Sequence, residues 1–141
     1  MKPLILDASE FTPKVVLDAD KHFFEIAGVS RPENVQGFYD PIISWFKDYH
    51  KKELTGVDPQ SAGPLKFVFK MEYFNSATSK ALLQLLEYLA VIKKDGYDLQ
   101  FDWYYDEWDD QMLEDGEDLA DAVNLKFNCI PREVDLDDED I

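Results

Sequence analysis

The chain has 141 residues, of which 45% are hydrophobic and 14% aromatic, enough apolar material for the core of one folded domain. Its 30 acidic side chains outnumber 14 basic ones and give a formal net charge of -16, which would repel nucleic acids and anionic membrane surfaces. The single cysteine, Cys129, excludes an internal disulfide and a cysteine zinc cluster.

The N-terminal segment lacks the long apolar core of a signal peptide, and no apolar run reaches membrane-spanning length. We therefore expect a cytoplasmic protein without direct membrane insertion and without a cofactor. Its acidic surface should favour protein partners that carry basic patches, and such partners would associate faster at low salt.

The first half of the chain predicts a hairpin followed by a helix. Short apolar runs at 14–18 and 22–26, separated by a polar turn, are typical of two paired strands. Ser30, Pro32 and Glu33 have the spacing of a helix N-cap, a first-turn proline and a capping box. An aromatic stripe at helical spacing predicts the buried face of this helix: Phe38, Ile42, Trp45, Phe46 and Tyr49.

Breakers from Gly56 to Pro64 indicate a loop, after which residues 65–73 alternate as a strand. The face of this strand predicted to be buried carries Leu65, Phe67, Phe69, Met71 and Tyr73. After Asn75 the pattern becomes helical and ends near Gly96. The apolar stripe of that helix consists of Ala81, Leu82, Leu85, Leu86, Leu89 and Ile92.

The last part of the chain predicts a strand at 97–105, an acidic helix at 109–123 and a short strand at 125–130. The predicted order is β-β-α-β-α-β-α-β. This order indicates an α/β fold in a single domain, with a mixed β-sheet and crossover helices. We expect the domain to span residues 1–130 and residues 131–141 to form an acidic C-terminal tail.

The junction Asn75-Ser76-Ala-Thr78-Ser79 places hydroxyl groups where a strand gives way to a helix. A helix N-terminus is suited to an anion, because free N–H groups and the positive end of the helix dipole lie there. A phosphate on Ser76 would therefore be tolerated. Ordinary helix capping by Asn or Ser explains the same residues more simply.

Enzyme signatures are absent from the sequence. His22, His50 and the lone cysteine form no metal or triad pattern, and no phosphate loop or nucleophile elbow occurs. The Asp- and Trp-rich segment 102–110 leaves one catalytic alternative open, a metal-dependent or paired-carboxylate hydrolase whose tryptophans stack on sugar. A solvated strand end followed by a helix start explains the segment more simply, so neither a catalytic nor a metal residue is assigned.

Five short segments, in chain order, carry motifs of one protein family. They are Thr12-Pro13, the stretch from Gly28 to Asn34, Phe38-Tyr39-Asp-Pro41 with Trp45 and Tyr49, the stretch from Glu72 to Ser76 with Ser79-Lys80, and Trp103-Tyr104-Tyr105-Asp106 with Gly116-Glu117. In these segments, from about Leu6 to about Phe127, the chain resembles the SiaC family of bacterial regulatory phosphoproteins.

The resemblance implies a small α/β protein similar in arrangement to anti-sigma-factor antagonists, phosphorylated by a dedicated protein kinase and reset by a phosphatase. The unphosphorylated form would bind and activate a signalling enzyme, a diguanylate cyclase or another output protein. The implied acceptor is Ser76, where the family usually has Thr. Ala77 replaces a hydroxyl residue, so Thr78 and Ser79 stay open as alternative acceptors.

The face that binds the output partner is expected around this junction. Tyrosine suits such a face because it buries a large area and keeps a polar tip. The residues assigned to this face are Tyr73, Asn75, Lys80, Tyr104, Tyr105 and Asp106. Besides the hydrolase, the remaining alternative is a constitutive acidic adaptor that binds its partner equally well with and without phosphate.

Overall fold

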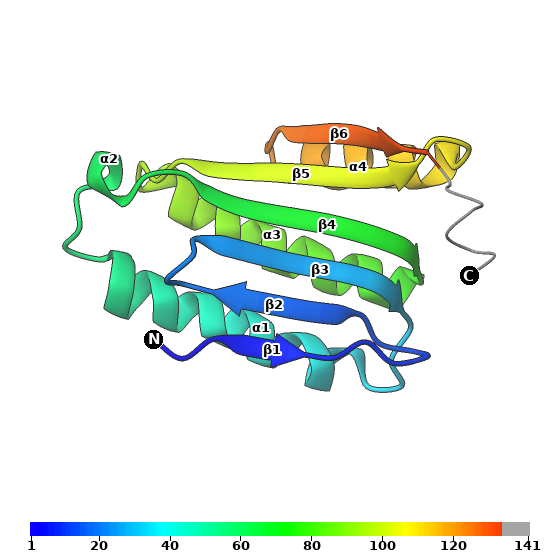
Figure 1. The fold of residues 1–141 in the computed structure, drawn as a ribbon, viewed down its shortest axis with the longest axis horizontal. Coiled ribbons are helices and arrows are strands. Elements are labelled where there is room, and N and C mark those ends of the chain that lie inside the picture. The colour runs from blue at the N-terminus through cyan, green and yellow to red at the C-terminus, as the bar shows by residue number, and fades with distance from the viewer. Residues whose placement is uncertain (134–141) are drawn as a thin grey trace.

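Six strands form one mixed sheet in the computed structural model, which describes residues 1–133 (Figure 1). The strands lie side by side in chain order: β1 (Leu4–Leu6), β2 (Lys14–Asp18), β3 (Phe23–Ser30), β4 (Leu65–Phe74), β5 (Leu99–Asp106) and β6 (Phe127–Arg132). β1, β2 and β3 pair antiparallel, whereas β3 to β6 pair parallel. Most of the expected acidic tail, residues 134–141, lies outside the described residues.

Helices connect the parallel strands and cover one face of the sheet. α1 (Val35–Tyr49) is followed by the π-helical turn η1 (His50–Leu54) and the short α2 (Pro59–Ala62), and together they lead from β3 to β4. α3 (Ser76–Lys94) joins β4 to β5, and α4 (Asp110–Ala122) joins β5 to β6. Figure 1 shows α1, α3 and α4 together behind the sheet.

The core lies between this helical layer and the covered face of the sheet. Aromatic side chains fill it: the rings of Phe67 and Phe69 stack with centroids 4.5 Å apart, and Phe46 of α1 stacks on Phe67 at 5.6 Å. The α3 stripe predicted from the sequence is buried throughout. Burial of this apolar area supplies the main stabilising free energy of the fold.

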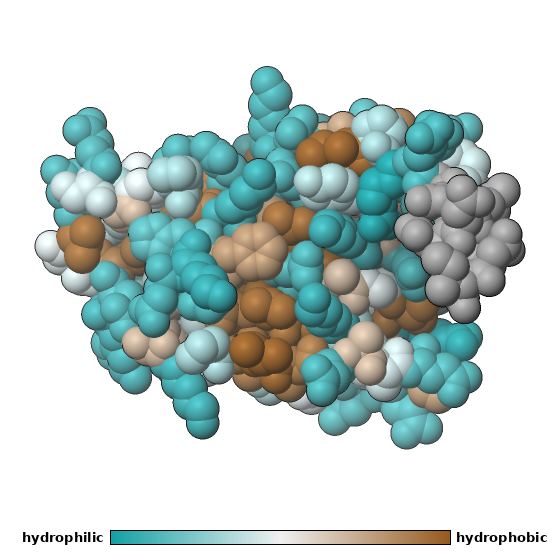
Figure 2. Space-filling model, viewed as in Figure 1, coloured by the Kyte–Doolittle hydropathy of each residue, from teal (hydrophilic) through white to brown (hydrophobic). Residues whose placement is uncertain are grey.

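No helix of residues 1–133 lies on the opposite face of the sheet, and lysine stems cover the centre of this face. Glu25 and Asp102 are nearly fully buried there. Lys14 and Lys70 lie 3.3 and 3.6 Å from the carboxylate of Glu25, and Lys66 lies 2.9 Å from that of Asp102. Figure 2 shows this face as largely hydrophilic, with an apolar patch over the β1 to β3 region. Lysine side chains can cover apolar surface while their ammonium groups stay in water.

The structure confirms the predicted α/β fold with a mixed sheet and crossover helices, and it adds β1, which was not expected. The proposed capping box before α1 is wrong. Asn34 is the N-cap, and its side-chain oxygen accepts a hydrogen bond of 3.0 Å from the Gly37 N–H. Ser30 instead ends β3 and is fully buried. The last strand begins and ends two residues later than predicted.

The predicted alternation of β4 breaks near its end. The pairing register shifts so that Gly28 lies opposite Met71 while Val29 lies opposite Tyr73, which leaves Glu72 without a partner in β3. An extra residue reverses which side chains face the core. Tyr73 is therefore exposed, contrary to the prediction, and Phe74 takes the inward position against Trp103.

Candidate functional site

The junction between β4 and α3 is a capped helix start. Asn75 has extended backbone angles, and its side-chain oxygen accepts a 2.9 Å hydrogen bond from the Thr78 N–H. The first intrahelical bond runs from the Ser79 N–H to the Asn75 carbonyl at 3.0 Å. Because amides of a first helical turn have no intrahelical acceptor, the N–H groups of Ser76 and Ala77 remain available at the positive end of α3.

The candidate acceptor hydroxyls differ in exposure. Ser76 is exposed, Ser79 is half-buried, and Thr78 is completely buried. A kinase must bring a hydroxyl in line with the phosphate of its nucleotide, so the side chain has to reach out of the protein surface. In this conformation Ser76 meets that condition and Thr78 does not.

Thr78 is held by two other buried hydroxyl groups. Its oxygen lies 2.9 Å from the Ser30 hydroxyl, which in turn lies 2.8 Å from the hydroxyl of Tyr39 on α1. Burial raises the pKa of Tyr39 to about 12, although its hydrogen bond with Ser30 acts in the opposite direction. These three residues attach the start of α3 to the end of β3 and to α1.

The carboxyl ends of the parallel strands bring most of the predicted partner-binding residues to one edge of the sheet, the right-hand edge in Figure 1. Tyr73 follows the register shift of β4 and is exposed, while Tyr105 and Asp106 end β5 and are half-buried. Asp106 forms a 3.6 Å ion pair with Arg132 at the end of β6. Lys80 is exposed one helical turn after Ser76.

Tyr104 lies apart from this group. It pairs in register with Lys70, whose ammonium group lies 5.2 Å from the centre of the Tyr104 ring on the face without helices. Asn75 acts as a helix cap and is half-buried. The predicted set is thus divided between the carboxyl edge and the open face of the sheet.

Two exposed aromatic residues at the carboxyl edge were not among the residues predicted to bind the partner. Trp108, just after β5, is 68% exposed, and Phe11, in the loop before β2, is 47% exposed. The Arg31 N–H donates a 2.8 Å hydrogen bond to the Phe11 carbonyl, which places that loop beside the end of β3. Exposed aromatic side chains are typical anchors of protein interfaces. Phe11 gave no local sequence signal, because only the fold brings its loop to this edge.

The Asp- and Trp-rich segment does not form a converging site. Trp103 is completely buried and donates a 2.9 Å hydrogen bond to the Met112 carbonyl, so it offers no face to a sugar. Asp102 pairs with Lys66, and Asp109 caps α4 by accepting from the Met112 N–H at 3.1 Å. Within residues 1–133, no group of three or more His, Cys, Asp or Glu side chains is placed to hold a metal ion.

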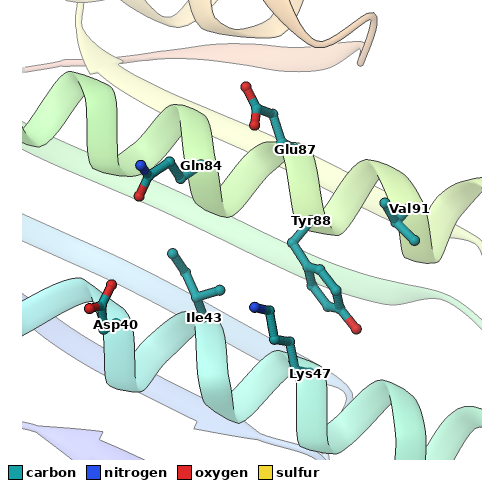
Figure 3. A pocket seen from close by; sticks show the side chains of 7 residues that line it. All are labelled: Asp40, Ile43, Lys47, Gln84, Glu87, Tyr88 and Val91. Carbon is teal, nitrogen blue, oxygen red and sulfur yellow. The ribbon is translucent and has the colours of Figure 1, made fainter. Parts of the chain in front are cut away.

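A groove lies away from the junction, between α1 and α3 (Figure 3). This groove of about 420 Å³ is lined by Asp40, Ile43, Lys47, Gln84, Glu87, Tyr88 and Val91. At its end, His50 Nδ1 lies 2.9 Å from the Tyr88 hydroxyl and its Nε2 lies 2.8 Å from the Asp95 carboxylate. These contacts join the C-terminal ends of the two helices.

No helix within the described part of the chain is long and apolar enough to cross a membrane.

Comparisons with known proteins agree on one family and one fold. The model of the SiaC family of regulatory phosphoproteins matches residues 6–132. An uncharacterised protein of Pseudomonas aeruginosa (strain UCBPP-PA14) is 23% identical over 127 residues, which cover 90% of this chain and 94% of that protein.

Two crystal structures from Pseudomonas aeruginosa share the fold. Apo-SiaC is 21% identical with a TM-score of 0.79, covering 92% of this chain and 99% of that chain. A chain in the complex of the diguanylate cyclase SiaD with its activator SiaC is 20% identical with a TM-score of 0.78 and has the same coverage. At this identity the likeness establishes the fold.

Proposed function

Because the chain belongs to the SiaC family of regulatory phosphoproteins, we propose that it is a partner switch controlled by phosphorylation of Ser76. The unphosphorylated form binds and activates a signalling enzyme, a diguanylate cyclase. A dedicated protein kinase adds the phosphate and a phosphatase removes it. The protein is the regulated component of this cytoplasmic system and not an enzyme.

The exposure of Ser76 at the first position of α3 carries this proposal. Among the three candidate hydroxyls, only Ser76 is exposed. The N-terminal amides of α3 and the exposed Lys80, one helical turn away, can stabilise a phosphate there. A phosphorylated side chain would therefore be compatible with the fold.

The switching step follows from desolvation of charge. A phosphate adds about two negative charges at the carboxyl edge of the sheet, where Tyr73 and Trp108 are exposed. A partner surface packed over this edge would have to remove water from the phosphate without providing a counter-charge. An unpaired charge buried at an interface costs about 2–5 kcal/mol, enough to release the partner.

The choice of a diguanylate cyclase is supported by a structural neighbour, the SiaC chain bound to SiaD, whose fold this chain shares over 92% of its length. Of the residues predicted to bind the partner, Tyr73, Lys80, Tyr105 and Asp106 lie at the carboxyl edge with Ser76. We assign the partner contact to this edge, and we add Phe11 and Trp108 to the set.

The acceptor is tested by incubating the purified protein with ATP and a soluble extract of the organism that encodes it, followed by phosphopeptide mapping. The expected label lies on Ser76, and Ser76→Ala abolishes it. Since Asn75 provides the cap, Ser76→Ala should leave the melting temperature unchanged, and Ser79→Ala is the matched control that keeps the label. Label confined to other residues would show the acceptor to be wrong.

The output is tested with protein that carries phosphoserine at position 76 and with unmodified protein, each used to capture partners from the same extract. The unmodified form should retain a diguanylate cyclase and increase its synthesis of cyclic di-GMP, whereas the phosphorylated form should do neither. Equal capture by both forms would support the constitutive adaptor. Capture of a protein of another enzyme class by the unmodified form alone would support the switch but would show that its output is not a diguanylate cyclase.

A further inference from the structure

Three buried hydroxyl groups beside the start of α3 form a row of hydrogen bonds, and the donor and acceptor of each bond can be assigned. Ser30, Tyr39 and Thr78 are each 0% exposed, so each polar atom has to find a partner inside the protein. The Thr78 hydroxyl donates to the Ser30 carbonyl at 3.0 Å. The Thr78 oxygen therefore accepts the Ser30 hydrogen, and the Ser30 oxygen accepts the Tyr39 hydrogen. Each of these three hydroxyl groups therefore donates its hydrogen to an acceptor inside the protein.

Ser30 fixes the first turn of α3 at more than one point. Its carbonyl also accepts a 3.3 Å hydrogen bond from the Asn75 N–H. The Asn75 side chain in turn accepts from the Thr78 N–H. The cap and the third residue of the helix are thus both attached to the end of β3, and the first turn cannot rotate about its axis without breaking these bonds.

This attachment determines which hydroxyl faces outward. Successive helix residues are about 100° apart, so Ser76 and Thr78 lie about 200° apart, on nearly opposite sides of α3. With Thr78 held inward, Ser76 points to solvent, whereas Ser79 lies to the side and is half-buried. A rotation of the turn that released Thr78 would change the exposure of both serines.

We propose that Thr78 is the positioning residue of the modification site: through the hydroxyl chain it sets the rotation of the first turn, so that the kinase receives Ser76 and not Ser79. This inference rests on the proposed role of Ser76 as acceptor. It assigns Thr78 a role in site selection in place of a role as an alternative acceptor.

The test compares Thr78→Val, which keeps the shape and removes the hydroxyl, with Thr78→Ser, which restores it. Thr55→Val is the matched control, because the Thr55 hydroxyl is exposed and bonds the His50 carbonyl far from this chain of hydroxyls. Each protein is incubated with ATP and the extract, and mass spectrometry follows the rate of labelling at Ser76 and at Ser79.

Thr78→Val should slow the labelling of Ser76 and raise the ratio of Ser79 label to Ser76 label about tenfold, because one lost buried hydrogen bond changes the equilibrium between two rotations of the turn by about that factor. Thr78→Ser and Thr55→Val should behave as the unchanged protein. Hydrogen exchange should be faster in Thr78→Val at the bonded amides of Asn75, Thr78 and Ser79, with β4 unaffected. If Thr78→Val does not fold, Tyr39→Phe replaces it; that variant removes only the outermost donor and should cause a smaller shift in the same direction.

Label on Ser76 alone, at an unchanged rate, in Thr78→Val would overturn the positioning role while leaving the proposed function intact. Failure of Thr78→Ser to restore the rate and site would also overturn it, since the hydroxyl would then not be the active feature. Absence of label on Ser76 in the unchanged protein would instead contradict the acceptor itself, and the role of Thr78 would fall with it.

Discussion

Replacing Gly116 of α4 with alanine tests how tightly this helix packs against the buried side chain of Trp103. Alanine in place of glycine usually stabilises a helix by about 1 kcal/mol. At Gly116, however, the new Cβ would lie 2.4 Å from Nε1 and 2.6 Å from Cδ1 and Cε2 of Trp103. The indole is completely buried, so it has no open space into which it can move.

The expected change in the free energy of unfolding combines two destabilising contributions and one stabilising contribution. Overpacking a filled core costs about 1–3 kcal/mol, and displacing the indole would weaken its hydrogen bond to the Met112 carbonyl, worth about 1–3 kcal/mol when a buried donor is left without a partner. Subtracting the helix gain of about 1 kcal/mol, we expect Gly116→Ala to lower the free energy of unfolding by about 1–5 kcal/mol. With a urea m-value of about 2 kcal/mol/M, the midpoint of urea denaturation should fall by about 0.5–2.5 M.

Gly37→Ala in α1 is the matched control. Its Cβ would also approach a neighbour to 2.4 Å, but that atom is Nδ2 of the exposed Asn34 side chain, which can rotate away. The lost cap, about 0.5–2 kcal/mol, and the helix gain nearly cancel, so stability should change by less than about 1 kcal/mol. If Gly116→Ala were as stable as the unchanged protein, the packing argument for Trp103 would be wrong.

Three further predictions concern the cap, the open face and alkaline pH. Asn75→Ala should lower the free energy of unfolding by about 1 kcal/mol while Asn75→Asp keeps it, as measured by urea denaturation; equal losses would argue against the cap. Lys66→Ala should cost about 1–3 kcal/mol in the same assay, because it deprives a buried carboxylate of its ammonium partner, whereas Asp102→Asn leaves a half-exposed lysine and should cost less; the reverse order would contradict this reasoning. Because burial raises the pKa of Tyr39 from 10.0 to about 12, the folded protein keeps a proton that the unfolded chain loses, so stability is full below about pH 10 and falls towards pH 12. Thermal unfolding of Tyr39→Phe should show a shallower decline over that range, and identical slopes would refute the assignment.

The carboxyl edge of the sheet illustrates why a sequence pattern predicts the buried face of a helix better than it predicts which side chains share a surface. Side chains at helical spacing share a face in any helix, so the buried stripe of α3 followed directly from the sequence. Tyr73 did not follow, because its direction depends on the register shift opposite Gly28 and Val29, which involves a strand more than forty positions earlier in the chain. Phe11 reaches the same edge through its contact with Arg31, which no local pattern records.

The sequence by itself determined the α/β class, the hairpin, the three main helices and the presence of capping residues at the start of α3, because periodicity and capping are local properties of the chain. It also identified the hydroxyl residues of the junction and the family to which the protein belongs. Only the tertiary structure decided which of these hydroxyl groups are exposed to solvent and which are buried. Ser30 and Tyr39, distant from Thr78 in the sequence, bury its hydroxyl and leave Ser76 exposed, because hydrogen bonding inside a packed core depends on which segments meet in space.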